Sequence, residues 1–267
     1  MGGAIPAKDV HPGIRRLPSG LLGSSRKPVL TITLEGSTVR LVTGRGRMVT
    51  GWMSMPFNPR LLQDGWVQDP PTLAGVIRNA LEKQGRFKGS VVAAFAGSRS
   101  VAREMTVPKL PDVAPEVMVP REARRIIGAA VDQSFLFWQL LEDTGREQRY
   151  FVLATPRGGL LSFLDTLKAS GLRPTKVDMK TLALARASGK ETAVVVNVEI
   201  DLLDIVILQD YIPKVINSVS LEGPSFEVEQ TASQLGTEIA RVIAYHDERN
   251  REQPLPPGAP VVLSGGH

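Results

Sequence analysis

One order of secondary-structure elements occurs twice along this chain of 267 residues, and this repeat limits the possible folds more than any other feature. Both copies combine short apolar runs, typical of strands, with one longer segment of helical periodicity. The first copy is expected to form strands at 29–34, 38–42, 48–55 and 90–96, with a helix over 73–81 before the last strand. The second is expected to form strands at 192–198, 202–208, 212–219 and 260–263, with a helix over 228–243. Both copies therefore have the order βββαβ.

The two copies align at a fixed offset of 164 residues. This offset places Thr33 on Asn197 and Glu35 on Glu199. It also places Ser37 on Asp201 and Leu41 on Ile205. Sequence identity between the copies is weak, so two unrelated hairpins with similar apolar patterning are the alternative. A true duplication predicts two similar α/β lobes.

A separate segment, residues 101–172, lies between the two copies. Its pattern predicts the order β-α-β-β-α, with strands at 101–110, 134–141 and 150–154 and helices over 121–131 and 160–167. This order is typical of a small α/β subdomain inserted into the first lobe. The expected divisions are a first lobe of residues 28–100 and 173–190, an inserted subdomain at 101–172, and an incomplete second lobe at 191–267. Residues 1–27, rich in Gly, Pro, Ser and Arg, are expected to be a disordered basic tail.

Composition excludes several classes of site. The chain has no cysteine, which excludes disulfides and any thiolate ligand or nucleophile. The net charge is +5, but aromatic residues are only 5% and do not interleave with the basic ones, so specific nucleic-acid binding is not expected. A basic surface that faces an acidic partner or an anionic membrane explains the charge equally well. Arg121, Arg124 and Arg125 are the candidate partner-binding residues, with a solvated helix face as the alternative.

Three short stretches resemble one family. Gly171, Pro174, Asp178 and the pair Arg186–Ala187 follow the signature of the type IV pilus assembly protein PilM family. The strand-like FVLATPR at 151–157 and the LSGG at 263–266 are also similar to that family. Cell-division FtsA and the cytoplasmic part of GspL share its architecture. The resemblance implies an actin-like α/β fold, with duplicated βββαβ lobes, an inserted small subdomain and a second lobe truncated at its C-terminus.

The resemblance also implies where a nucleotide would bind. In this fold the first hairpin turn of each lobe holds the ATP phosphates through backbone N–H groups, and an aspartate organises Mg²⁺. The corresponding positions here are Thr33, Glu35, Gly36, Ser37 and Thr38 in the first lobe, and Asn197, Glu199 and Asp201 in the second. The loop on the adenosine side corresponds to Ser264, Gly265 and Gly266.

Both phosphate turns depart from the family pattern in the same way. Thr33 and Asn197 replace the aspartates, and Glu35 and Glu199 replace glycines. A carboxylate about 4 Å from a phosphate charge costs about 4 kcal/mol at an effective dielectric constant of 20. We therefore expect a degenerate site, no bound cofactor, no catalytic residue and no metal.

The two glutamates themselves are expected to be exposed turn residues without a role, with cation binding as the alternative. Asp201 and Asp204 are likewise expected at the surface. An active actin-like ATPase, which forms filaments as FtsA does, is the alternative function, with ATP and Mg²⁺ as its cofactors. A sugar or acetate kinase of the same superfamily would need a catalytic aspartate and a sugar cleft, and neither is visible.

The function implied by the resemblance is that of a scaffold without enzymatic activity. Such a protein is expected in the cytoplasm, peripheral to the inner membrane, among the proteins of the pilus assembly platform. Its expected partner is the short cytoplasmic N-terminal peptide of a PilN-like membrane protein, held between the first lobe and the inserted subdomain by residues 90–172. Contacts with other platform proteins and a homo-oligomer are further expectations.

Overall fold

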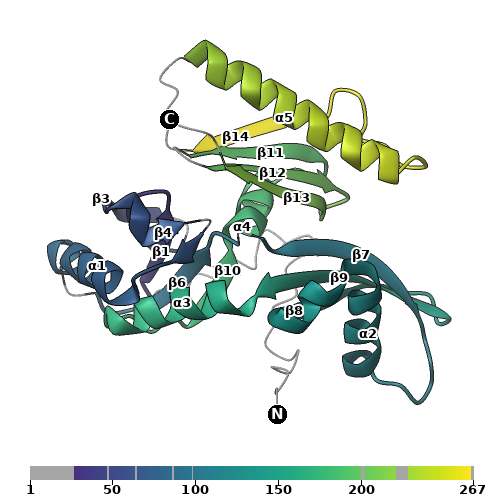
Figure 1. Ribbon diagram of the computed structural model, residues 1–267, viewed down its shortest axis with the longest axis horizontal. Helices are drawn as coiled ribbons and strands as arrows, with labels where there is room; N and C mark the ends of the chain where they lie inside the picture. The colour runs from purple at the N-terminus through teal and green to yellow at the C-terminus, as the bar shows by residue number, and fades with distance from the viewer. Residues whose placement is uncertain are drawn as a thin grey trace.

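The computed structural model of the protein describes residues 27–265, apart from positions 47, 64, 86, 98, 200, 201 and 221–227. The described residues form two sheet-and-helix lobes, one above the other, with a third sheet to one side (Figure 1). The predicted tail, except for Lys27, lies outside the described residues. Asp201 and Gly266 also lie outside them.

The first lobe is built on a five-stranded sheet of order β10-β6-β1-β2-β3. Its strands are β1 (Val29–Glu35), β2 (Thr38–Arg45), β3 (Met48–Pro56), β6 (Ser90–Phe95) and β10 (Lys176–Met179). Strand β1 is antiparallel to β2 and parallel to β6. Between β3 and the first helix lie a short 3-10 helix, Pro59–Leu61, and a ribbon of two-residue strands, β4 (Leu62–Gln63) and β5 (Trp66–Val67).

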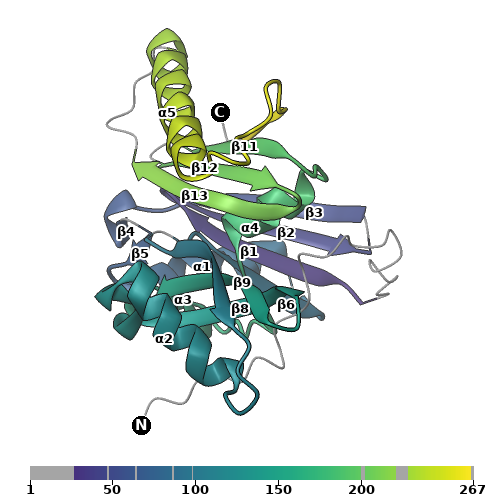
Figure 2. The same ribbon diagram turned by 90° about the vertical axis from the view of Figure 1, so that its right-hand side faces the viewer.

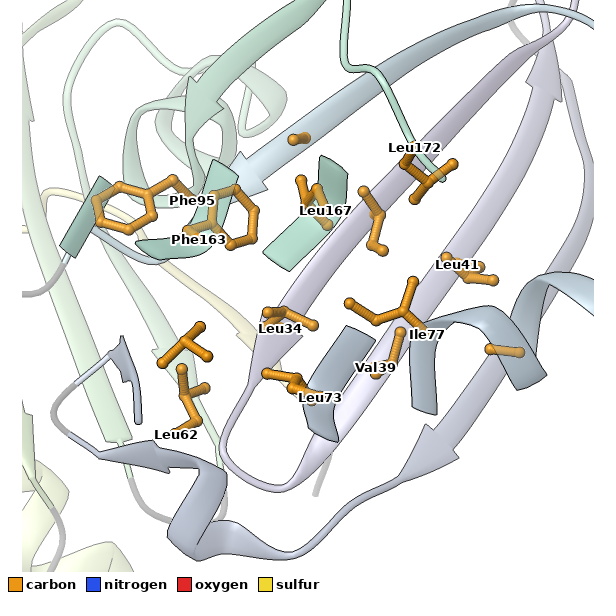
Figure 3. Close-up of a cluster of buried hydrophobic side chains, with 14 of the residues drawn as sticks. Leu34, Val39, Leu41, Leu62, Leu73, Ile77, Phe95, Phe163, Leu167 and Leu172 are labelled. Atoms are coloured by element: carbon orange, nitrogen blue, oxygen red, sulfur yellow. The ribbon is translucent and has the colours of Figure 1, made fainter. Parts of the chain in front are cut away.

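Helices α1 (Pro70–Gln84) and α3 (Arg157–Ala169) cover one face of this sheet. Helix α1 begins where the Asp69 side chain accepts a hydrogen bond of 3.1 Å from the Thr72 amide, and prolines occupy its first turn. Strand residues such as Leu34 and Leu41 pack against Ile77 of α1 and Leu167 of α3 (Figure 3). Burying each such side chain stabilises the fold by about 1.5–3 kcal/mol.

The second lobe has a four-stranded sheet of order β13-β12-β11-β14. Its strands are β11 (Ala193–Val198), β12 (Leu202–Gln209), β13 (Ile212–Ser220) and β14 (Val261–Gly265). The long helix α5 (Val228–Arg249) packs on one face through residues such as Val242. Helix α4 (Lys180–Ala187), which follows the last strand of the first lobe, packs on the other face through Ala185. Figure 1 shows α4 between the two lobes.

The pairing of the strands supports the predicted duplication. Thr33 pairs with Arg40 in the first hairpin, and Asn197 pairs with Asp204 in the second, which are equivalent positions at the offset of 164. The bulge between the second and third strands also falls at equivalent places, after Thr43 in one lobe and after Ile207 in the other. The two βββαβ units therefore share the pairing register of their strands as well as the order of their elements.

The third sheet belongs to the segment between the repeats and has the order β7-β9-β8. Its elements are β7 (Val101–Pro108), α2 (Pro115–Ile127), a 3-10 helix (Ala129–Gln133), β8 (Ser134–Asp143) and β9 (Glu147–Pro156). Helix α2 begins at Pro115, six residues before the predicted start at 121. Proline is favoured in the first turn of a helix, but the apolar periodicity used for the prediction did not extend to this turn. Figure 2 shows β13 of the second lobe passing above this part of the molecule.

Candidate functional site

The two phosphate turns predicted from the sequence lie where the lobes meet. The first joins β1 to β2, and Gly36 in it has a φ of 52°, a left-handed conformation that favours glycine. The second joins β11 to β12, where the Glu199 amide donates to the Leu202 carbonyl at 2.9 Å. The N-terminus of α4 enters the same region. The structure thus brings residues far apart in sequence together where the lobes meet.

Glu35 and Glu199 are not exposed, which corrects the expectation from the sequence. Only 7% of Glu35 and 4% of Glu199 is accessible to solvent. Asp204, also expected at the surface, is 1% exposed. Three acidic residues are therefore buried where the lobes meet, and burial without partners would cost each of them several kcal/mol.

Arg40 of β2 connects the two turns directly. Its Nη1 donates to Glu35 Oε2 at 2.7 Å and to Glu199 Oε1 at 2.9 Å. Its Nη2 donates to Glu199 Oε2 at 2.8 Å, so the guanidinium holds the Glu199 carboxylate in the two-pronged geometry typical of strong arginine pairs. One side chain of the first lobe is thus hydrogen-bonded to the turns of both lobes.

Lys180, the first residue of α4, makes a second connection between the lobes. Its Nζ lies 3.1 Å from Glu35 Oε1 and 2.8 Å from Asp204 Oδ2. The other oxygen of Asp204, Oδ1, accepts a hydrogen bond of 2.6 Å from Ser218. Lys180 is itself only 6% exposed. We call Glu35, Arg40, Lys180, Glu199 and Asp204 the cleft network.

Protonation in the cleft network follows from burial and pairing. Burial raises the pKa of Glu35, and the negative charge of Glu199 adds to this, although the attraction of Lys180 opposes it. Burial alone would also raise the pKa of Glu199, but hydrogen bonds from Arg40 outweigh it, so this pKa is lowered. Burial opposes the charge of Lys180, yet Asp204 and Glu35 together raise its pKa. Lys180 therefore stays charged.

The residues that replace the family's aspartates make only secondary contacts. Thr33 Oγ1 lies 3.4 Å from Glu35 Oε1, and Asn197 Nδ2 lies 3.4 Å from Glu199 Oε1. Ser264 of the adenosine-side loop donates to Asn197 Oδ1 at 3.1 Å. Thr33 and Asn197 therefore border the cleft network, and Ser264 lies behind Asn197.

Other predicted residues lie at the edge of the site or away from it. The Ser37 carbonyl accepts a hydrogen bond of 2.7 Å from the Phe57 amide, and Thr38 pairs with Glu35 and Pro56 at the start of β2. Gly265 ends β14 beside Val198. The contacts of these residues are therefore those of ordinary turn and strand positions.

The arginines of α2 are distant from the cleft and largely paired. Arg124 lies 3.1 Å from Asp132, and Arg125 forms a pair of 2.5 Å with Glu122. Arg121 is exposed on the same helix. Because exposed pairs of this kind contribute at most about 1 kcal/mol, they indicate a solvated surface.

Metal ligands and membrane spans are not found in the described part of the chain. No group of three or more acidic or histidine residues there could hold a metal ion. Within the same residues, no helix combines the length and the apolar character that crossing a bilayer requires. In the cleft, ammonium and guanidinium groups accompany the carboxylates.

No family model matches the sequence, and no curated protein does. The structure is similar to a chain of the PilM–PilN type IV pilus biogenesis complex, with a TM-score of 0.70 and 23% sequence identity, over 90% of this chain and 82% of that one. Two more distant structures are the cytoplasmic domain of EpsL from the type II secretion system of Vibrio cholerae and a protein of actin-like ATPase fold from Bacteroides thetaiotaomicron. EpsL has a TM-score of 0.46 and 17% identity over 73% of this chain and 71% of its own. The Bacteroides protein has a TM-score of 0.46 and 10% identity, over 91% of this chain and 84% of its own.

The similarity to the PilM–PilN structure confirms the predicted fold. The chain has an actin-like α/β fold with two related lobes. At 23% identity this likeness shows the fold alone, and the chemistry of the site has to be argued from the residues in the cleft.

Proposed function

We propose that this protein is a scaffold of a type IV pilus or related secretion assembly platform, and that it works without binding or hydrolysing ATP. It would act in the cytoplasm at the inner membrane, together with other platform proteins. The fold of the PilM–PilN structure supports the setting, and the cleft network supports the absence of nucleotide chemistry.

One observation carries the proposal: the chain's own side chains join the two phosphate turns. Arg40 bonds Glu35 in one turn and Glu199 in the other, at 2.7–2.9 Å. A nucleotide phosphate between these turns would have to displace two buried carboxylates from Arg40 and then lie beside them. The repulsion is about 4 kcal/mol for each pair of unit charges 4 Å apart at an effective dielectric constant of 20.

The proposed partner is a short extended peptide from the cytoplasmic N-terminus of a PilN-like membrane protein. Two sheet edges could pair with such a segment, because among the described strands β10 ends the first-lobe sheet and β8 ends the third sheet. Val177 on β10 is 42% exposed and Leu140 on β8 is 45% exposed, so apolar contact is available at both edges. Strand addition to a free edge is a common mode of peptide recognition.

The nucleotide part of the proposal is tested by isothermal calorimetry of the whole chain with Mg-ATP. We expect no binding at millimolar nucleotide. Micromolar affinity would refute the proposal and favour the active actin-like ATPase.

The partner part is tested with a fluorescent peptide from the cytoplasmic tail of a neighbouring platform membrane protein, followed by anisotropy. We expect saturable binding that Val177→Asp weakens at least tenfold. Val117→Asp on the outer face of α2, where Val117 is 63% exposed, is the matched control and should leave the affinity unchanged. If the chain binds DNA and not the peptide, the proposed partner is wrong and the basic charge of the chain indicates nucleic-acid binding instead.

A further inference from the structure

The cleft network links the lobes through two separate ion pairs. Glu35, Arg40 and Lys180 come from the first lobe and the helix that follows it, whereas Glu199 and Asp204 come from the second lobe. Arg40 reaches Glu199, and Lys180 reaches Asp204. Glu35 lies between the two cations and contacts both. The five side chains therefore form one continuous series across the cleft.

The same series contains three carboxylates and two cations. If all five groups were charged, the cleft would keep one uncompensated negative charge among residues that are less than a tenth exposed, apart from Arg40. Two carboxylates that share a buried site respond by holding one proton between them. Burial raises the pKa of Glu35 and hydrogen bonds from Arg40 lower that of Glu199, so Glu35 is the first of the two to take up a proton as the pH falls.

We propose that the cleft network is a clasp that holds the two lobes together in place of a bound Mg-nucleotide. Arg40 and Lys180 supply the positive charge that Mg²⁺ would supply in an active member of this fold, and Glu199 and Asp204 supply the negative charge. This inference rests on the proposed nucleotide-independent function and names how the same cleft is held closed.

The clasp predicts that the association of the lobes depends on pH, and the direction follows from the pKa shifts of Glu35 and Glu199. The stabilising effect of a proton on Glu35 is complete below the ordinary pKa of 4.5 and is lost as the pH rises through the raised pKa. The stabilising effect of ionised Glu199 is present above 4.5 and is lost as the pH falls through its lowered pKa. The lobes should therefore be held most tightly between the lowered pKa of Glu199 and the raised pKa of Glu35.

The test measures the distance between the lobes by paired spin labels. The chain has no cysteine, so Lys83→Cys on α1 and Ala240→Cys on α5, both exposed, introduce one label in each lobe. We expect one narrow distance distribution, the same with and without Mg-ATP. Arg40→Glu should broaden or lengthen it, and adding Glu199→Arg to restore the opposite charges should bring back the narrow distribution.

Glu35→Gln tests the effect of protonation at position 35 separately from the ion pairs across the lobes, because the amide imitates the protonated carboxyl. In this variant the distance between the lobes should depend less on pH than in the unaltered chain, because position 35 no longer titrates. Arg125→Glu, which disrupts an exposed pair on α2, is the control and should change nothing. Should Arg40→Glu fail to fold, Arg40→Lys, which keeps the charge and loses the two-pronged geometry, is expected to broaden the distribution instead.

The clasp is overturned if the distance does not respond to any Arg40 variant, or if Glu35→Gln shows the same pH profile as the unaltered chain. Failure of the proposed function looks different, because it appears as Mg-ATP binding or as a missing peptide affinity while the distance still depends on Arg40.

Discussion

Each buried carboxylate of the cleft lies within 3.1 Å of a cationic nitrogen. Transfer of one such ion from water costs several kcal/mol even after relaxation, and only close partners with additional hydrogen bonds offset it. At Asp204, Lys180 pairs with one oxygen and Ser218 donates to the other. The partners of these residues, more than the carboxylates alone, determine whether the lobes can meet.

Asp204→Ala is therefore expected to lower the free energy of unfolding by about 3–5 kcal/mol. The loss arises because the buried ammonium of Lys180 keeps only Glu35 as an acidic partner. Urea denaturation monitored by circular dichroism at pH 7 measures it.

The matched comparison is Glu238→Ala on α5, where the carboxylate pairs with an arginine that is 61% exposed. This change should cost less than about 1 kcal/mol. Equal effects of the two substitutions would mean that the buried pair contributes no more than a surface pair.

The sequence alone singled out two of the five residues of the cleft network. The shared offset revealed Glu35 and Glu199 as equivalent residues, and the same offset relates Arg40 to Asp204, which carry opposite charges in paired hairpins. That opposite charge was a usable signal. Lys180 had no such signal, because it enters the cleft from a helix 145 residues beyond Glu35, and only the meeting of the lobes brings them together.

At the scale of single elements, the LSGG stretch shows how packing accounts for a motif that resembles a ligand loop. Gly265 has a φ of 142°, and a Cβ there would lie 2.0 Å from the Val198 carbonyl oxygen. Since β14 runs parallel to β11 at this point, the neighbouring backbone leaves no space for a side chain. Glycine is needed at this position for the sheet of the second lobe, with or without a nucleotide.

Gly265→Ala is expected to destabilise the protein by about 1–3 kcal/mol, since both the backbone conformation and the close approach become strained. Thermal unfolding of the variant checks it. Gly75→Ala within α1 meets nothing within 4 Å and should instead stabilise by up to about 1 kcal/mol, because alanine favours a helix over glycine. A neutral Gly265→Ala would show that the β14 end can move away from β11.

The strands and helices with strong periodicity were predicted near their observed bounds, whereas the short β10 and α4 were not. Their sequence, 176–187, was recognised only as a family signature. Four strand residues and eight helical ones are too few for a period to show. Their structure depends on long-range contacts, as β10 pairs with β6 and α4 packs on the second-lobe sheet.

At the scale of the whole molecule, one apolar cluster joins parts that the sequence divides. It contains Ala102, Phe151 and Leu153 of the third sheet, Met179 of β10 and Ile212 of β13. An ion pair of 2.5 Å between Lys214 and Glu104 crosses the same boundary. The inserted subdomain therefore packs on both lobes and links them in addition to the cleft network.

This arrangement predicts that the described parts unfold as one cooperative unit. Phe151→Ala should lower the free energy of unfolding by about 3–5 kcal/mol, because it leaves a cavity where three parts of the molecule meet. Hydrogen exchange followed by fragment should show protection falling together in β9, β12 and β6. Leu161→Ala on the outer side of α3, where the side chain is 46% exposed, is the control and should have little effect. Loss of protection in β9 alone would show that the lobes are stable without the inserted subdomain, and the cleft network would then be the main link between them.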